Sequence, residues 1–184
     1  KRQDELMKFL FIGRIMKEKG IEEYLEVAEQ ISQSFLNVEF QILGPFEEMK
    51  YKNIIDNIRN KKIVYLGISQ DVRNEIKEVD CIINPSYHEG MSNVLLEGAA
   101  MGKPLIASNI PGCKEIIRNG YNGYLFEVGS STDLKDKIVK FVKLSKKEKE
   151  IMGMNSRKIV ETEFDRNIII DEYINAINNI LNKR

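Results

Sequence analysis

The 184-residue sequence predicts an α/β fold, in which a mostly parallel, doubly wound sheet of six strands carries helices on both faces. Short apolar runs alternate along the chain with longer stretches whose apolar residues recur at helical spacing. The runs 81–84 and 105–107 are apolar throughout, which is typical of strands buried on both faces. No internal repeat, linker or low-complexity tract interrupts this alternation. We therefore expect a single domain.

The expected elements follow one another in a regular order. Strands are predicted at 7–12, 38–43, 63–66, 81–84, 105–107 and 124–127, and Gly13, Gly44 and Gly67 end the first three. Helices are predicted at 20–34, 47–60, 71–78, 93–101, 132–144, 146–162 and 167–182. We expect a single domain over residues 1–184, with a core at about 6–145 and C-terminal helices at 146–184.

Helical spacing also assigns faces and ends to individual helices. In the stretch 20–34 the buried face is expected to hold Ile21, Leu25, Ala28 and Ile31. The opposite face is expected to present acids to water, namely Glu22, Glu23, Glu26 and Glu29. Gly102 follows the stretch 93–101 and is expected to cap the C-terminus of that helix.

Composition excludes several classes of protein. The 28 basic and 28 acidic residues leave no formal net charge, which argues against a dedicated nucleic-acid binder. Cys81, Cys113 and the single histidine, His88, have neither a disulfide framework nor zinc-ligand spacing. No apolar run approaches the ~20 residues of a membrane span, and no signal segment is recognisable. We expect a reduced, cytoplasmic domain. The sequence begins at Lys1 without an initiator Met and almost directly before a strand, so either a pro-segment has been removed or, as we favour, the sequence is an excised piece of a longer protein.

Doubly wound folds bind ligands at the carboxyl ends of their strands, so functional residues are expected in the loops that follow each strand. The first loop, 13–20, has no Gly-x-Gly-x-x-Gly pattern, but it carries Arg14 and Lys19 beside a helix start. A guanidinium fork and an ammonium group suit a pyrophosphate. The alternative is that both are solvent-exposed loop charges, one of them paired with Glu18.

The segment 84–99 carries a second group of polar residues. Ser92 or Asn93 is the expected N-cap of the following helix, whose free N–H groups form an anion or hydroxyl site, and Gly90 permits close approach of a ligand. Glu89 precedes the helix, and Glu97 follows Asn93 by one turn. Two carboxylates in this arrangement suit the hydroxyl pairs of a nucleotide sugar. The alternative is that Glu89 complements the helix dipole and Glu97 is an exposed helical residue.

The remaining features are weaker. The stretch 98–104 resembles a phosphate loop, but its glycine spacing is one residue short and Pro104 replaces Ser or Thr. The turn 110–115 either closes over the site or is a plain connection. His88 is a general-base candidate or a structural residue, and Cys113 has no histidine to activate it. The basic run 135–149 is either a solvated helix face or a weak membrane-surface contact.

Six short segments of the sequence, in the same order, resemble segments of the C-terminal, donor-binding domain of retaining GT-B glycosyltransferases, the group 1 or family 4 set. They are FIGRIMKEKG (11–20), ILGP (42–45), VYLG (64–67), EGMSNVLLEG (89–98), GKPLIAS (102–108) and NGYNGYLF (119–126). The resemblance covers about residues 6–145 and implies a Rossmann-like domain that is one half of a GT-B fold. Gly98 stands where Ala is common, and the loop at Gly44-Pro45 is shorter than usual, which leaves base selectivity open.

The resemblance implies roles for the matching positions. Arg14 and Lys19 would hold the donor diphosphate and stabilise the leaving charge, so that neither a metal nor a cofactor is implied. Glu97 would bind the ribose and Glu89 the hexose, and Glu89, Arg14 and Lys19 would form the catalytic set. The base would lie near Ile68 and Ser69. Backbone amides would surround the sugar and phosphate at Gly90, Met91, Ser92 and Asn93.

The same resemblance implies a function for the whole protein. It would be a retaining, metal-independent glycosyltransferase that moves a sugar from a UDP- or GDP-sugar to a glycan or lipid-linked acceptor in surface polysaccharide biosynthesis. An N-terminal acceptor domain would lie outside this sequence, so that the isolated domain would be inactive. The stretch 167–182 would then expose an apolar stripe. We expect a cytoplasmic protein with at most a peripheral contact at the inner face of the membrane.

Three alternatives from other classes stay open at this point. A sugar-nucleotide epimerase of related fold would need more acid–base residues than one histidine supplies. A nicotinamide-dependent oxidoreductase is disfavoured by the missing glycine pattern. A non-catalytic nucleotide-binding or regulatory module remains possible, because α/β domains serve many functions.

Overall fold

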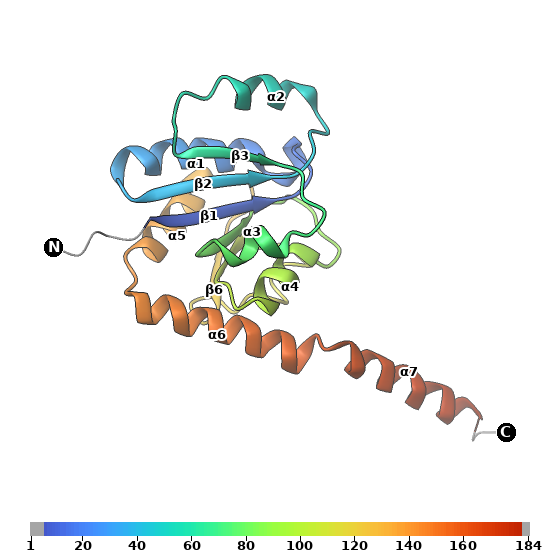
Figure 1. Ribbon diagram of the computed structural model, residues 1–184. Coiled ribbons are helices and arrows are strands. Elements are labelled where there is room, and N and C mark those ends of the chain that lie inside the picture. Colours follow the sequence, from blue (N-terminus) through green and yellow to red (C-terminus); the bar gives the residue numbers. More distant parts are fainter. Residues whose placement is uncertain (1–5, 182–184) are drawn as a thin grey trace.

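The computed structural model describes residues 6–181, which form a six-stranded sheet in the order β3-β2-β1-β4-β5-β6 with every neighbouring pair parallel (Figure 1). The strands are β1 (Met7–Ile12), β2 (Val38–Leu43), β3 (Ile63–Gly67), β4 (Cys81–Asn84), β5 (Leu105–Ser108) and β6 (Gly123–Phe126). Strand order runs outward in both directions from the central pair, β1 and β4. The fold is therefore the predicted doubly wound α/β domain.

Seven α-helices and one short 3-10 helix connect or follow these strands in the described part of the chain. They are η1 (Lys17–Lys19), α1 (Ile21–Ser34), α2 (Met49–Asp56), α3 (Arg73–Lys77), α4 (Asn93–Ala100), α5 (Ser131–Val142), α6 (Lys146–Glu163) and α7 (Arg166–Leu181). The sequence did not predict η1, and α2 is shorter than the predicted 47–60. The side chain of Asn57 donates to the carbonyl of Asn53 at 2.7 Å, and this local bond competes with a further helical turn. The last residue of the predicted helix 167–182 lies outside the described residues.

The two faces of the sheet carry separate apolar cores. One set of strand side chains, which includes Phe9, Phe40 and Ile83, packs against α1, α2 and α5. The other set, which includes Leu10 and Ile82, packs against α3 and α4. Successive residues of a strand point to opposite faces, so strands that are apolar throughout supply both cores.

Helix α1 buries a wider face than its sequence pattern predicts. Ile21, Ala28 and Ile31 are buried as expected, and Tyr24 and Val27 are buried with them. The prediction that Glu23 faces water is wrong: the side chain is half-buried, because its Oε1 accepts a hydrogen bond from the hydroxyl of Tyr87.

The ends of α4 follow the predicted capping pattern. Ser92 is the N-cap, and its Oγ accepts a hydrogen bond from the backbone N–H of Leu95 at 3.4 Å. Met101 closes the helix, and Gly102 follows it in a left-handed conformation, with φ of +69°. The helix therefore begins directly after the loop that carries Glu89.

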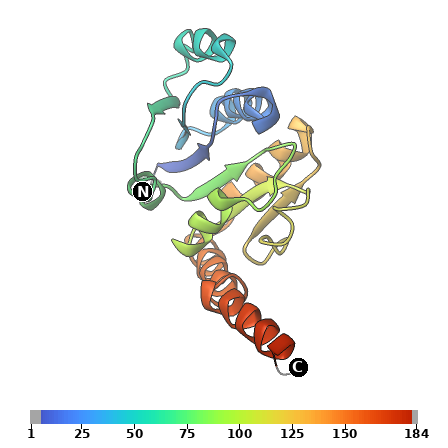
Figure 2. The ribbon, with the colours of Figure 1, turned by 90° about the vertical axis from the view of Figure 1, so that its right-hand side faces the viewer.

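Helix α7 projects from the rest of the domain, as Figures 1 and 2 show from two directions. Its described side chains are exposed, and they include several large apolar ones: Ile168, Ile170, Tyr173, Ile174, Ile177, Ile180 and Leu181. The apolar stripe expected for the stretch 167–182 is thus present on its described residues.

Candidate nucleotide-sugar site at the switch point

Strand order reverses between β1 and β4, and the loops that leave these two strands lie side by side. The first loop runs over residues 13–20 and the second over residues 85–92. Open α/β sheets bind their ligands outside the carboxyl ends of the strands at such a point. The predicted residues Arg14 and Lys19 lie on the first loop, and Glu89 lies on the second.

A glycine allows the two loops to come into contact. Gly20 has φ of +72°, and a Cβ built on it would lie 2.1 Å from the carbonyl oxygen of Pro85. Any side chain at this position would push the N-terminus of α1 away from the second loop. The backbone N–H of Tyr87 then donates to the carbonyl of Glu18 at 2.9 Å, which joins the loops directly.

Lys19 and Glu89 form an ion pair across this contact. Lys19 Nζ lies 2.9 Å from Glu89 Oε1, and the side chains are 23% and 16% exposed. The amide of Asn84, at the end of β4, lies 3.5 Å from the same carboxylate oxygen. A half-buried pair of this kind is held more firmly than a surface pair, because water screens it less.

The residue Asn84 also connects the strand to helix α4. Its Nδ2 donates to Ser92 Oγ at 2.7 Å, and its Oδ1 accepts from the hydroxyl of Ser86 at 2.6 Å. All three side chains are buried. This network holds both ends of the loop that carries Glu89, and it aims the N-terminus of α4 at the same edge of the sheet.

The turn after β5 packs against this loop. The backbone N–H of Ser92 donates to the carbonyl of Gly112 at 3.1 Å, and a Cβ built on Gly112 would lie 2.3 Å from the carbonyl oxygen of Gly90. The turn 110–115 therefore borders the site. Of the four amides predicted to surround a ligand, that of Ser92 is engaged within the protein. Those of Gly90, Met91 and Asn93 lie on exposed residues.

Neither Arg14 nor Glu97 forms an ion pair with Lys19 or Glu89. Arg14 is exposed, and its Nη1 lies 3.6 Å from Glu47 Oε1 in the loop after β2. The carboxylate of Glu97, on α4, has no hydrogen bond or ion pair to any side chain among residues 6–181, and partial burial raises its pKa above 4.5. The structure thus pairs two of the four charged residues with each other, while Arg14 faces Glu47 and Glu97 has no charged partner among residues 6–181.

The two residues predicted to lie near a base follow β3. Ile68 is 70% exposed, and Ser69 Oγ accepts a hydrogen bond from the backbone N–H of Asp71 at 3.2 Å. Both lie at the carboxyl edge of the sheet, beyond β2. An exposed apolar side chain at this edge could pack against an aromatic ring and remove apolar surface from water.

Comparison with known proteins gives a consistent assignment. The family model described as "Glycosyl transferases group 1" matches residues 1–159. The chain belongs to this family. The capsular polysaccharide biosynthesis glycosyltransferase CapM of Staphylococcus aureus is 29% identical over 177 residues, which are 93% of this chain and 46% of the relative. The group 1 chain thus spans about half the length of a curated relative.

Solved structures agree on the fold. Anabaena HepE in complex with UDP and glucose has a TM-score of 0.80 and 18% identity, over 94% of this chain and 48% of that one. The C-terminal domain of the group 1 protein LpcC from Francisella tularensis has a TM-score of 0.79 and 23% identity, over 88% of each chain. The group 1 domain therefore has the predicted Rossmann-like fold of one half of a GT-B glycosyltransferase.

Sequence reasoning did not single out three residues that organise the site of this group 1 domain. The sequence pattern marks Asn84 only as the end of a strand, gives Tyr87 no role and places Glu23 on the solvent face of its helix. A polar residue that ends an otherwise apolar strand is a signal that could have identified Asn84. No sequence signal identified Tyr87 and Glu23, because their contact joins residues 64 positions apart.

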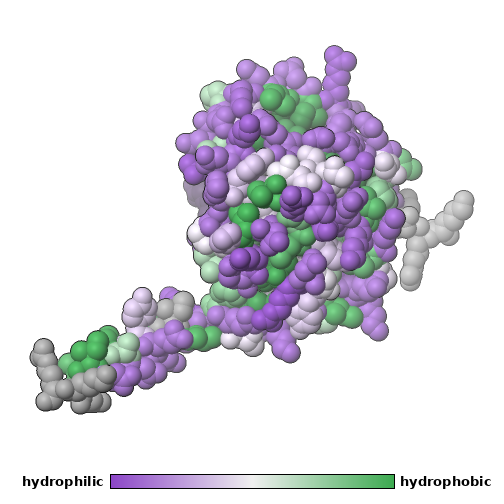
Figure 3. Space-filling model, turned by 180° about the vertical axis from the view of Figure 1, so that it is seen from behind, coloured by the Kyte–Doolittle hydropathy of each residue, from purple (hydrophilic) through white to green (hydrophobic). Residues whose placement is uncertain are grey.

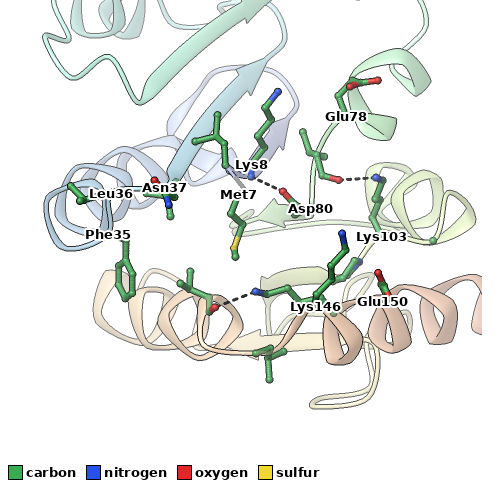
Figure 4. A pocket seen from close by; sticks show the side chains of 18 of the residues that line it. Met7, Lys8, Phe35, Leu36, Asn37, Glu78, Asp80, Lys103, Lys146 and Glu150 are labelled. Carbon is green, nitrogen blue, oxygen red and sulfur yellow. Dashed lines mark hydrogen bonds between the residues drawn. The ribbon is translucent and has the colours of Figure 1, made fainter. Parts of the chain in front are cut away.

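A cavity of about 1350 Å³ lies at the opposite edge of the sheet, around the amino ends of β1, β2, β4 and β5 (Figure 4). Two of its lysines are bonded to the protein: Lys103 Nζ donates to the carbonyls of Lys77 and Val79, and Lys149 Nζ donates to that of Val142. None of the predicted site residues lines this cavity. Volume alone therefore does not locate the site, and the switch point is the better candidate.

Other expectations concern metals, single residues and membranes. Within residues 6–181, no group of three or more His, Cys, Asp or Glu side chains is arranged to hold a metal ion. His88 is exposed, and burial raises the pKa of Cys113 to about 12. Among the described helices, none has the length and apolar character needed to cross a membrane.

Proposed function

We propose that this domain binds a nucleoside-diphosphate sugar at the carboxyl edge of its sheet and acts as the donor half of a retaining, metal-independent glycosyltransferase. The observation that carries the proposal is the Lys19–Glu89 ion pair at the switch point, beside the N-terminus of α4. It brings a cation for a diphosphate and a carboxylate for sugar hydroxyls together at one point. The UDP and glucose bound by the structural relative support this class of ligand.

The diphosphate would take over the cations of the first loop. Lys19 would exchange its contact with Glu89 for phosphate oxygens. Arg14 is exposed and has only a long contact, 3.6 Å, with the carboxylate of Glu47, so its side chain would turn from Glu47 to the ligand. The free N–H groups in the first turn of α4 would add partial positive charge. Together these groups would balance the negative charge of UDP or GDP, so that the proposal requires no metal.

The two carboxylates would divide the sugars of the donor between them. Glu89, released from Lys19, would accept hydrogen bonds from hexose hydroxyls, while Glu97 would accept them from the ribose. The carboxylate of Glu97 has no partner within residues 6–181, and it therefore has both oxygens available. The exposed side chain of Ile68, with Ser69, would border the base.

These contacts suggest how the domain would assist transfer. When the bond between the sugar and the diphosphate breaks, negative charge grows on the phosphate oxygen that leaves. Lys19 and Arg14 would stabilise that charge more strongly in the transition state than in the bound donor. No residue here is assigned the role of a covalent nucleophile, and retention would follow from attack of the acceptor on the face that the leaving group vacates.

A second domain of the same protein would supply the acceptor-binding site and the rest of the active site. The chain spans 46% of CapM, and α7 presents exposed apolar side chains such as Ile177 and Ile180 that such a domain would cover. A glycan or lipid-linked acceptor in surface polysaccharide biosynthesis is proposed from the relative's function in capsule formation. We place the protein in the cytoplasm, with at most a peripheral membrane contact.

Thermal-shift titration of the isolated chain tests the proposal. UDP or GDP, and the corresponding sugar nucleotides, are expected to raise the Tm, and NAD is expected to have no effect. The shift should disappear in Arg14→Ala and Glu97→Gln. Stabilisation by NAD alone would favour the oxidoreductase, and turnover by the isolated chain would contradict the need for a second domain. Nucleotide binding without transfer in the full-length protein would favour a non-catalytic module.

A further inference from the structure

The side chain of Tyr87 connects three parts of the fold. It follows β4 in the loop 85–92, and its hydroxyl donates a hydrogen bond to Glu23 Oε1 on α1. A Cβ built on Gly129, in the turn before α5, would lie 3.2 Å from the same hydroxyl oxygen. The hydroxyl is thus enclosed between α1 and that turn, although no substrate role has been assigned to it.

The hydroxyl of Tyr87 remains the donor of this hydrogen bond at neutral pH. The bond to Glu23, with burial, raises the pKa of Tyr87 to about 12, so the hydroxyl keeps its proton and remains a donor. Glu23 Oε2 is buried and has no hydrogen-bond partner among residues 6–181. The carboxylate therefore depends on the hydroxyl, and loss of that donor would leave a half-buried charge without compensation.

Tyr87 makes one of the two contacts that join the loops and lies two residues from the other. Its own backbone N–H donates to the carbonyl of Glu18 at 2.9 Å, one residue before Lys19. Glu89, two residues further along, bonds to Lys19 at 2.9 Å. Only one residue separates Glu89 from Tyr87, which is bonded to α1. The bond of Tyr87 to α1 therefore helps to determine where Glu89 lies relative to Lys19.

We propose that Tyr87 is a positioning residue for donor recognition: by bonding to Glu23, it holds the loop 85–92 against α1 and fixes where the carboxylate of Glu89 stands. This role rests on the proposed function, because Glu89 is there assigned to the sugar. In this proposal Tyr87 acts through Glu89, because its hydroxyl is bonded to Glu23 and its backbone N–H to Glu18. Its loss should therefore weaken recognition of the sugar while leaving that of the diphosphate intact.

Binding measurements on the 184-residue chain separate these two contributions. The probes are UDP, UDP-glucose, UDP-galactose and UDP-N-acetylglucosamine. The quantity measured is the gain from the sugar, defined as the Kd for UDP divided by the Kd for the sugar nucleotide that binds most tightly. Tyr87→Phe and Glu23→Ala are expected to reduce this gain at least about fivefold, while the Kd for UDP changes less than about twofold. Glu23→Gln, which keeps an acceptor oxygen, should retain most of the gain.

Tyr24→Phe is the matched control. It removes a hydroxyl that donates to the carbonyl of Gln41 at 2.8 Å, in the core and without a hydrogen bond to the loop 85–92. It should lower the Tm and leave the gain from the sugar unchanged. An unchanged gain in Tyr87→Phe, or an equal loss for UDP and sugar nucleotides, would overturn the proposal.

Amide hydrogen exchange of the free chain gives a second readout that needs no ligand. In Tyr87→Phe the amides of residue 87, bonded to Glu18, and of Ser92, bonded to Gly112, should exchange about tenfold faster. In Tyr24→Phe they should not change. Failure of the wild type to bind any probe would remove the proposed function, whereas unchanged exchange in Tyr87→Phe would by itself refute the positioning role.

Discussion

Nζ of Lys19 lies 2.9 Å from Oε1 of Glu89, so the charged groups that follow the two central strands neutralise each other in the free domain. A ligand that carries both a diphosphate and hydroxyls would replace this contact at each end. The ion pair therefore holds both side chains at the site, and it also competes with the ligand for their charged groups. The effect of breaking it can be measured.

Lys19→Ala should weaken binding of UDP about tenfold or more, because it removes a charge-assisted contact to the diphosphate. The change also leaves Glu89 without its cation, so the Tm should fall. Isothermal titration with UDP measures the first effect. Lys17→Ala, at an exposed neighbouring position of η1, is the control and should bind UDP as the wild type does. Equal affinity in Lys19→Ala would contradict the role of this lysine.

Arg14→Ala should separate binding from stability. The contact of Arg14 with Glu47 spans 3.6 Å between side chains that are about half exposed, and such pairs contribute about 0–1 kcal/mol. The Tm should therefore stay nearly constant while the affinity for UDP falls. Arg73→Ala, which removes another exposed arginine paired with Asp71, should change neither quantity. A large loss of Tm in Arg14→Ala would mean that this residue is structural.

Glu97→Gln should stabilise the free domain at neutral pH and weaken its binding of nucleotides. Partial burial raises the pKa of Glu97 in the folded state, so its favourable contribution is present at low pH and is lost as the pH rises through that pKa. Glutamine does not ionise. The Tm of the variant should exceed that of the wild type at about pH 7, and the two should converge below pH 4.5, the ordinary value. A gap that widens on acidification would contradict this assignment.

Gly20→Ala should be far more damaging than Gly120→Ala. Both glycines are left-handed, with φ of +72° and +81°, so each substitution costs about 1–2 kcal/mol in backbone strain. Only at Gly20 does the new Cβ also meet a carbonyl, that of Pro85 at 2.1 Å, while Gly120 has open space. The overlap adds about 1–3 kcal/mol and separates the two loops of the site. Denaturant unfolding and UDP titration of both variants test this difference.

Helix α7 should contribute little to the stability of the isolated chain, because its described side chains are exposed. A chain that ends at Asp165 should unfold within about 2 °C of the full sequence, which corresponds to less than about 1 kcal/mol. In the full-length protein, Ile177→Glu should lower stability, since we expect a second domain to cover this residue. A large loss of Tm on truncation would contradict the exposed position of α7, which Figures 1 and 3 show extending from the domain.

Both ends of helix α4 could be predicted, because they depend on residues close in the sequence. The polar residues before an apolar helical stretch predict Ser92 or Asn93 as the N-cap, and the structure selects Ser92. Gly102 was identified as a helix-ending residue in the same way. Glu23 was assigned to the wrong environment, because periodicity within α1 carries no information about Tyr87, which lies on another segment.

Apart from η1, the sequence by itself determined the element types, their order and the parallel α/β class, since these follow from periodicity and turn residues that act within a few positions. The tertiary structure alone decided which loops meet. Lys19 and Glu89 are 70 residues apart, and they come into contact because β1 and β4 are neighbours and Gly20 lets the loops touch. It also decided that Lys19, rather than Arg14, is the partner of Glu89, because side-chain pairing depends on distances that only the packed fold establishes.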